Sequence, residues 1–265
     1  MPFLTTEDGC NIYYTTQGSD TATRVIIFLN GTTQTTLYWG ATVPAFSKRF
    51  RLIYYDARAQ GQSDLGANPI SLKSHVADLK FLMTQLGIEK ANLVGISHGA
   101  RVALALAIEN PDRVARLVLC SLGAHTSQRS RITVQSWLQL LRISGLEAMA
   151  WAALPAVFGE NFLKQHENSL DMIVKAVVKR NRKKALLAQL DALLQYPPLD
   201  AVPVGFDRPT LILTGAEDPL VPSEDAQRLA DLCKAHHEHL SGIGHSIPAE
   251  APRLFEELVL EFLKK

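Results

Sequence analysis

The stretch Gly95-Ile96-Ser97-His98-Gly99 decides the fold of this 265-residue chain, together with the residues on either side of it. The apolar run 91–94 before it predicts a strand, and the pattern after it predicts a helix. A turn that sharp holds a serine in a strained backbone conformation with its hydroxyl exposed, and small residues two positions away on each side prevent clashes between strand and helix. The start of the helix also directs the positive end of its dipole toward the serine. A G-x-S-x-G match is weak by itself, so it is this flanking strand and helix that make Ser97 a candidate nucleophile.

Short apolar runs and helical patterns alternate along the chain on both sides of this turn. Runs that are apolar on successive residues are typical of strands buried on both faces of a parallel sheet. Five such runs occur, at 25–29, 52–55, 91–94, 117–120 and 210–213. Two alternating segments around Asp8-Gly9 predict an opening hairpin. The predicted fold class is therefore α/β, with a mostly parallel, doubly wound sheet.

The segment 125–204 interrupts this alternation. It contains several apolar helix faces and no convincing strand. We interpret it as a helical cap over the carboxyl ends of the strands, inserted into a core formed by 1–124 and 205–265. As ordinary core helices it would leave the sheet with an unusually long crossover. Some apolar side chains of the cap are candidates to face a substrate, although packing of the cap on the core explains any one of them equally well; the candidates are Trp137, Leu141, Trp151 and Phe158.

A serine hydroxyl becomes a good nucleophile only when a base removes its proton and a carboxylate orients that base. His245 lies in a flexible Gly-x-Gly-His loop before the final helix and is the candidate base. Asp218 comes just after the strand predicted at 210–213, where functional loops of such sheets gather, and is the candidate acid. Glu217 is the alternative acid. The alternative for Asp218 is a purely structural role, as a turn residue before Pro219.

An acyl-transfer site also needs backbone N–H groups that stabilise the oxyanion. The residue after the nucleophile, His98, supplies the first of these groups. The second comes from the loop after the first buried strand, where Gly31 allows the chain to fold over the site. Thr32 is the candidate for this second N–H, and Thr33 is the alternative.

Taken together, these residues resemble the α/β-hydrolase superfamily, in its serine-nucleophile esterase- and lactonase-like branch, over essentially the whole chain. The matching motifs are the oxyanion loop at Asn30-Gly31, the D-x-R-x-x-G-x-S-D stretch from Asp56 to Asp64, the serine elbow, Pro111-Asp112-Arg113-Val114, the acid at Asp218, and Gly244-His245. The resemblance implies an eight-stranded sheet with an inserted helical cap. The serine disfavours the branches of this superfamily that use aspartate as the nucleophile. Three positions depart from the common pattern: Asn30 replaces a histidine, Ala59 a glycine, and Ala100 the second glycine after the serine.

Composition and charge argue against several classes of partner. The chain is 47% hydrophobic and 20% charged, as in ordinary globular proteins. Its 27 basic and 26 acidic side chains give a formal net charge of +1, so we expect neither nucleic acid nor a membrane surface as a partner. Three scattered cysteines and an amino terminus without a signal pattern favour a cytoplasmic location. We expect a monomer or homodimer that acts on a small-molecule ester or acyl substrate and needs no metal or other cofactor.

Three functions fit these observations. The first is a serine hydrolase that cleaves a carboxylic ester or lactone of a small to medium, largely apolar substrate through an acyl-enzyme. The second is a thioesterase or acyltransferase that acts on acyl-CoA or acyl-carrier substrates. The basic run 175–184 and a local similarity of the Asn30-Gly31 loop to acyltransferase-like members point to it, although a solvated helix face also explains the basic run. The third is a non-catalytic ligand-binding protein on the same fold, and the intact set of Ser97, Asp218 and His245 argues against it.

Overall fold

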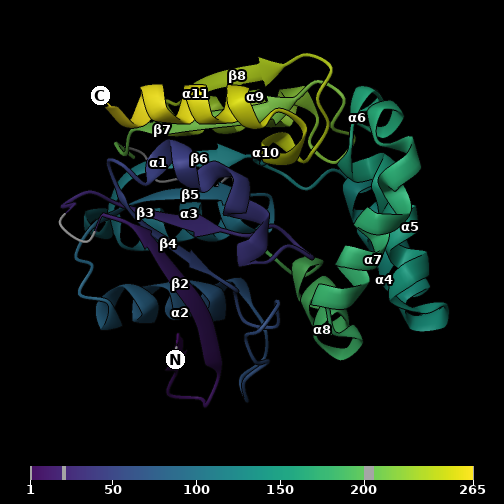
Figure 1. Cartoon of the computed structure of the whole chain (residues 1–265), viewed down its shortest axis with the longest axis horizontal. Helices are drawn as coiled ribbons and strands as arrows, with labels where there is room; N and C mark the ends of the chain where they lie inside the picture. Colours follow the sequence, from purple (N-terminus) through teal and green to yellow (C-terminus); the bar gives the residue numbers. More distant parts are fainter. Residues whose placement is uncertain (1, 20–21, 200–205, 265) are drawn as a thin grey trace.

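One eight-stranded sheet runs through the centre of the computed structural model, which describes residues 2–19, 22–199 and 206–264 (Figure 1). The strands are β1 (Phe3–Thr5), β2 (Asn11–Gly18), β3 (Val25–Leu29), β4 (Arg51–Tyr55), β5 (Ala91–Ile96), β6 (Val114–Cys120), β7 (Thr210–Gly215) and β8 (His236–Leu240). Their order across the sheet is β1-β2-β4-β3-β5-β6-β7-β8. β2 pairs antiparallel with β1 and with β4, and the remaining neighbours pair in parallel. The predicted mostly parallel, eight-stranded α/β sheet and its opening hairpin are confirmed.

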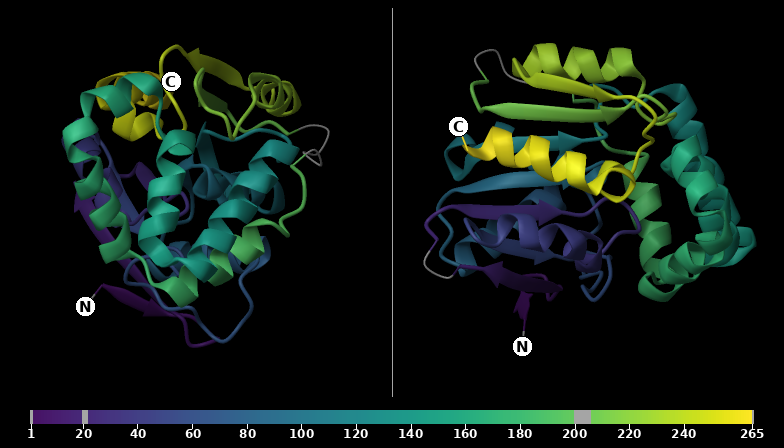
Figure 2. Two further views of the ribbon diagram at one scale, coloured as in Figure 1. Left: turned by 90° about the vertical axis from the view of Figure 1, so that its right-hand side faces the viewer. Right: turned by 45° about the horizontal axis from the view of Figure 1, so that its top comes forward.

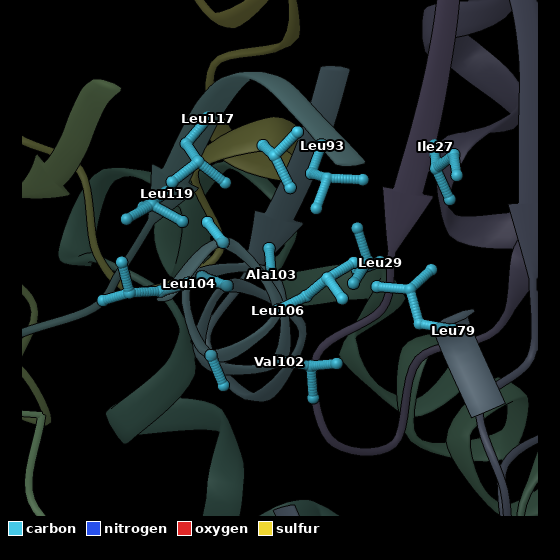
Figure 3. Close-up of a cluster of buried hydrophobic side chains, with 14 of the residues drawn as sticks. Ile27, Leu29, Leu79, Leu93, Val102, Ala103, Leu104, Leu106, Leu117 and Leu119 are labelled. Carbon is cyan, nitrogen blue, oxygen red and sulfur yellow. The ribbon is translucent and has the colours of Figure 1, made fainter. Parts of the chain in front are cut away.

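Helices cover both faces of this sheet. Those of the core are η1 (Thr36–Thr42), α1 (Val43–Phe46), α2 (Leu72–Gln85), α3 (His98–Glu109), η2 (Pro111–Arg113), α9 (Ser223–Cys233), α10 (Ile247–Glu250) and α11 (Pro252–Lys264). In β3, Ile27 and Leu29 belong to a cluster with α2, α3 and α9, whereas Ile26 and Phe28 belong to a cluster with η1, α1 and α11. Figure 3 shows the first cluster, with side chains of α3 packed on β3, β5 and β6. Because both faces are covered, every residue of β3 is buried, and its sequence is continuously apolar rather than alternating.

A layer of helices lies between β6 and β7 in the sequence. It consists of α4 (Gln128–Ile143), α5 (Gly145–Val157), α6 (Glu160–Gln165), η3 (Glu167–Ser169), α7 (Leu170–Arg180) and α8 (Lys183–Leu193), and the described part of this segment contains no strand. Figures 1 and 2 show these helices together at one end of the sheet, set apart from the core helices. Apolar clusters formed by their own side chains hold the layer together. We call this layer the cap; its predicted boundary at 204/205 lies outside the described residues.

The D-x-R motif after β4 organises the loops at the same end of the sheet. The buried carboxylate of Asp56 accepts the backbone N–H of Thr36 at 2.7 Å, which ties the loop after β3 to the loop after β4. Arg58 donates to Asp78 at 2.8 Å and to Asp8 at 2.6 Å, which joins α2 to the opening hairpin. The Arg58 guanidinium holds the pKa of Asp8 well below its ordinary range. This motif, one of those that carry the family resemblance, thus has a structural role, and it supports the loop that carries the candidate oxyanion N–H.

Candidate active site

Ser97 stands between β5 and α3 with φ 52° and ψ −114°. This backbone conformation is strained for a residue with a Cβ, as the sequence predicts for a serine at such a turn. A Cβ on Gly95 would lie 2.6 Å from Ala100 N, and a Cβ on Gly99 would overlap Leu29 O. Only glycine therefore fits at these two positions, and the pair of glycines lets the turn close at the end of β5.

The structure brings Asp218 to His245 and places Glu217 elsewhere. His245 Nδ1 lies 2.7 Å from Asp218 Oδ2, and the Asp218 side chain is 0% exposed. The other carboxylate oxygen of Asp218 accepts the N–H of Leu220 at 2.8 Å, which fixes the orientation of the carboxylate. Glu217 Oε2 instead accepts the N–H of Glu160 at 2.6 Å, at the start of α6. Of the two candidate acids, Asp218 has the position that orients a histidine, and Glu217 joins the core to the cap.

The loop that carries His245 is held from both the core and the cap. Ser121 Oγ, just after β6, donates to His245 O at 2.7 Å. The N–H groups of His245 and Ser246 both donate to Val157 O, at 3.1 and 3.0 Å, where α5 ends. The position of the candidate base therefore depends on the cap as well as on the sheet.

Glu250, a residue that the sequence analysis missed, strengthens the same connection. Its Oε2 accepts the N–H of Gly159 in the cap at 2.8 Å and that of Gly244 at 2.9 Å. Its Oε1 accepts the N–H of Ser246 at 3.0 Å. One carboxylate thus fixes the backbone on both sides of His245 and attaches it to the cap. No sequence motif marks this role, because it depends on a contact between segments 91 residues apart.

Replacing Glu250 by glutamine is expected to lower kcat for a 4-nitrophenyl ester by about tenfold, with a smaller change in KM. An amide has one acceptor oxygen instead of two and would turn its NH₂ group toward one of the backbone N–H donors. Steady-state kinetics of Glu250→Gln check this, with Glu257→Gln on the exposed surface of α11 as the matched control. If kcat of Glu250→Gln stays within twofold of the unmodified protein, Glu250 does not position the His245 loop.

Ser97 and His245 line the same cavity, of about 190 Å³, between the core and the cap. No hydrogen bond joins their side chains among the interactions of the described residues. Bonds of this kind are often long or misaligned without a substrate and tighten when it binds. The cavity volume lies below the about 300–1,000 Å³ typical of pockets for drug-sized ligands, which favours a small substrate.

The candidate oxyanion loop is a tight turn after β3. Gln34 N donates to Gly31 O at 3.2 Å, and Thr33 has φ 67°, the backbone conformation of the third residue of a type II turn. Thr32, Thr33 and His98 all line the cavity beside Ser97. Within the described ranges, none of their three N–H groups donates to a protein acceptor. Thr32 and His98 are therefore available as oxyanion donors, and Thr33 stays open as the alternative to Thr32.

The ring of His98 is buried, and it is not a candidate for the base. It is buried against the ring of His75, with centroids 4.5 Å apart, and burial lowers the pKa of His98 to about 4. Among the other histidines, His237 of β8 is hydrogen-bonded to Thr214 Oγ1 at 2.7 Å and does not line the cavity. His125 also lines the cavity, and its Nδ1 lies 3.4 Å from the partly exposed Asp225 Oδ1. His245 has the shorter contact, 2.7 Å from its Nδ1 to the fully buried carboxylate of Asp218, and lines the cavity with Ser97.

Two of the four predicted substrate-contact residues reach the cavity. Trp137 and Phe158 line it, whereas Leu141 is fully buried among the cap's own side chains. Trp151 is 43% exposed on the surface. The sequence of α5 is apolar nearly all round, so its pattern does not reveal which side meets the cavity. The α5 residues that line it are Met149, Ala150, Ala153, Leu154 and Val157.

Arg180 also lines the cavity, although the sequence analysis assigned the basic run 175–184 to a solvated face or a carrier site. The sequence does contain a pattern that indicates that Arg180 faces the cavity. Ile173, Val177 and Arg180 are spaced i, i+4, i+7 on α7 and share one helix face, and all three line the cavity. Lys179 falls between them and is exposed. The apolar residues at helical spacing, rather than the charge count, indicate which basic side chain turns inward.

Three further observations concern chemistry outside this cavity. No group of three or more His, Cys, Asp or Glu side chains that could hold a metal ion is found among the residues whose placement the structure gives. The three cysteines are free and buried, and burial raises the pKa of both Cys10 and Cys233 to about 12. The same residues contain no helix both long and apolar enough to cross a membrane.

The fold and this site identify the class of protein. The family model described as the alpha/beta hydrolase fold matches residues 24–252. The chain therefore belongs to the α/β-hydrolase fold family, and this membership supports hydrolytic activity.

Similar proteins cover nearly the whole chain. One relative is "Putative carbamate hydrolase RutD" of Caulobacter vibrioides, which is 29% identical over 264 residues, or 98% of this chain and 97% of its own. Among solved structures, an alpha/beta hydrolase enzyme from a Medee basin deep-sea metagenome library has a TM-score of 0.91 at 29% identity, over 99% of this chain and 97% of its own. The enol-lactonase from Burkholderia xenovorans LB400 has a TM-score of 0.90 at 26% identity, over 100% of both chains.

Proposed function

We propose that this protein is a serine hydrolase that cleaves a carboxylic ester or lactone of a small to medium, largely apolar substrate through an acyl-enzyme on Ser97. One observation carries the proposal. A strained elbow serine shares a cavity with a histidine whose Nδ1 is bonded at 2.7 Å to a buried carboxylate. The apolar cap side chains in the cavity wall support a largely apolar substrate, and the volume of about 190 Å³ supports a small one.

In the proposed mechanism, Ser97 Oγ attacks the carbonyl carbon while His245 Nε2 takes its proton. The N–H groups of Thr32 and His98 stabilise the negative charge that develops on the carbonyl oxygen. His245 then gives the proton to the departing alcohol oxygen, which leaves an acyl group on Ser97. Water, deprotonated by His245, attacks this acyl group and releases the acid, and the proton returns to Ser97. Asp218 holds the Nδ1–H tautomer of His245 and stabilises its imidazolium form throughout.

Two other functions stay as alternatives. A thioesterase or acyltransferase would use the basic run 175–184 to bind a phosphate-bearing carrier. Much of that run is engaged within the protein, since Lys175 pairs with Asp171 at 2.6 Å and Arg182 donates to Ser63 O. Lys183 is exposed and donates to Arg142 O at 3.2 Å. Within this run, only Lys179 and Lys184 are exposed and have no partner for their side chains among the described residues. A non-catalytic ligand-binding protein is the second alternative.

A panel of 4-nitrophenyl esters and matched acyl-thioesters tests this choice. We expect the short-chain ester to be hydrolysed with a kcat/KM at least about tenfold above that of the thioester with the same acyl group. Faster turnover of the thioesters would favour the carrier-dependent alternative. Failure of folded protein to turn over any member of the panel would favour the ligand-binding alternative.

We also propose that the enzyme is cytoplasmic and acts as a monomer or homodimer on a freely diffusing substrate. The near-neutral charge of the chain supports a small molecule rather than a nucleic acid or a membrane surface as the partner. The free, buried cysteines agree with a reducing compartment. The triad chemistry itself uses no cofactor.

A further inference from the structure

The fully charged side chains that line the cavity are all positive among the described residues. Arg101, Arg131 and Arg180 line it, and no Asp or Glu is found among the described residues that do. His125 also lines it, with Asp225 at 3.4 Å from its ring. Three guanidinium groups without a carboxylate in the wall give the cavity a positive potential, which favours a negatively charged ligand.

Two of these arginines hydrogen-bond to oxygens of the cap. Arg101, on α3, donates to Pro197 O at 2.7 Å and to Thr126 Oγ1 at 3.2 Å, and so ties both ends of the cap to the core. Arg131 is exposed and donates to Leu194 O at 3.3 Å, which joins α4 to the end of α8. Protein oxygens therefore already explain the positions of these two side chains.

The Arg180 side chain has a different environment. Its Nε donates to Thr33 O at 2.9 Å, in the candidate oxyanion loop, and Asn181 Nδ2 donates to the same oxygen at 3.0 Å. The terminal nitrogens of Arg180 have no hydrogen-bond or carboxylate partner in the part of the chain that the structure describes. Burial lowers the pKa of Arg180, as expected for a cation withdrawn from water without an anion beside it. The guanidinium is thus fixed at one edge and open at the other, next to the loop where an ester carbonyl would bind.

We propose that Arg180 binds an acidic group of the substrate, so that the preferred substrates are esters or lactones that also carry a carboxylate. This inference rests on the proposed function and adds the substrate class to it. The two terminal nitrogens of a guanidinium match the two oxygens of a carboxylate in a bidentate pair. Because Arg180 is fixed and partly desolvated before the substrate arrives, little further ordering opposes this pair. Much of the rest of the cavity wall is apolar and would accommodate the carbon chain that links the two groups.

A matched pair of substrates tests the proposal: monomethyl glutarate, and methyl valerate, in which a methyl group stands in place of the carboxylate. We expect unmodified protein to hydrolyse monomethyl glutarate with a kcat/KM at least about tenfold higher. In Arg180→Met this ratio is expected to fall about 30-fold, and in Arg180→Lys by a smaller factor because the charge remains. Lys179→Met removes one positive charge from the same helix outside the cavity, and its ratio should match that of the unmodified protein within twofold.

The ratio separates recognition of the carboxylate from the contact that Arg180 makes with Thr33. If Arg180→Met lowers both reactions equally, Arg180 only holds the oxyanion loop, and the proposal is overturned. A preference of the unmodified protein for methyl valerate overturns it as well. Failure of the proposed function gives a different result, because neither ester would then be hydrolysed by any variant. Calorimetry of glutarate and valerate binding to Ser97→Ala provides a readout without turnover, in which Arg180→Met should weaken only glutarate binding.

Discussion

Replacing Ser97 by alanine is expected to lower kcat for a 4-nitrophenyl ester by about 10⁴-fold or more. The alanine cannot form an acyl-enzyme, and only oxyanion stabilisation and substrate binding would remain. Alanine and serine carry the same Cβ, so the strain at φ 52° stays the same and the fold should be retained. Steady-state hydrolysis measures the effect, and circular dichroism and the thermal midpoint verify the fold.

Ser136→Ala is the matched control for this substitution. Ser136 is exposed on α4 and does not line the cavity, so its removal should leave kcat unchanged within twofold. If Ser97→Ala retains activity within about tenfold of the unmodified protein, Ser97 is not the nucleophile.

Replacing Asp218 by asparagine is expected to lower kcat by about 10³- to 10⁴-fold, the second-largest effect. The asparagine amide can turn its NH₂ toward His245 Nδ1, which would then have to accept instead of donate. The ring would present Nε2–H to Ser97, and a protonated Nε2 cannot act as a base. The comparison of kcat between the two forms, with the same ester, measures this tautomer effect.

Glu217→Gln is the sharpest control for Asp218→Asn, because the two acids are neighbours in the sequence and only one of them contacts His245. Glutamine can still accept the N–H of Glu160 at the start of α6, so kcat is expected within about threefold of that of the unmodified protein. A larger loss of kcat in Glu217→Gln than in Asp218→Asn would reverse the assignment of the acid.

The sequence predicts the sheet well because burial on both faces leaves a direct signature. β3 is apolar at every position since helices cover both of its sides, and the elbow glycines are required by the close approach of α3 to β5 and β3. Two of the departures from the family pattern also have structural explanations. Asn30 is buried, accepts from Trp39 Nε1 at 2.8 Å and donates to Tyr55 O at 2.9 Å, which fixes the start of the loop. Ala59 has φ 69°, the conformation for which glycine is the common residue.

Residues of the candidate site that depend on long-range contacts are less predictable. Asp218 and His245 follow from loops at strand ends, where chemistry collects in parallel sheets. Of the four candidate substrate contacts, Trp151 and Leu141 do not line the cavity, because the cap helices pack on several neighbours and their sequences do not show which apolar side chains face it. Glu250 and Arg180 hydrogen-bond to backbone atoms of distant segments, namely those of Gly159 and Thr33. Helical spacing indicates that Arg180 turns inward, but local patterns do not identify either backbone partner.

Covalent labelling with a fluorophosphonate tests the central claim most directly, because the reagent reacts only with a serine that a base has activated. Intact-mass measurement and peptide mapping of labelled protein are expected to show one adduct, on Ser97. The rate of labelling should fall strongly in Asp218→Asn and stay unchanged in Glu217→Gln, and Ser97→Ala should not be labelled. Folded protein that stays unmodified, or an adduct on another serine in place of Ser97, would contradict the assignment of Ser97 as the activated nucleophile.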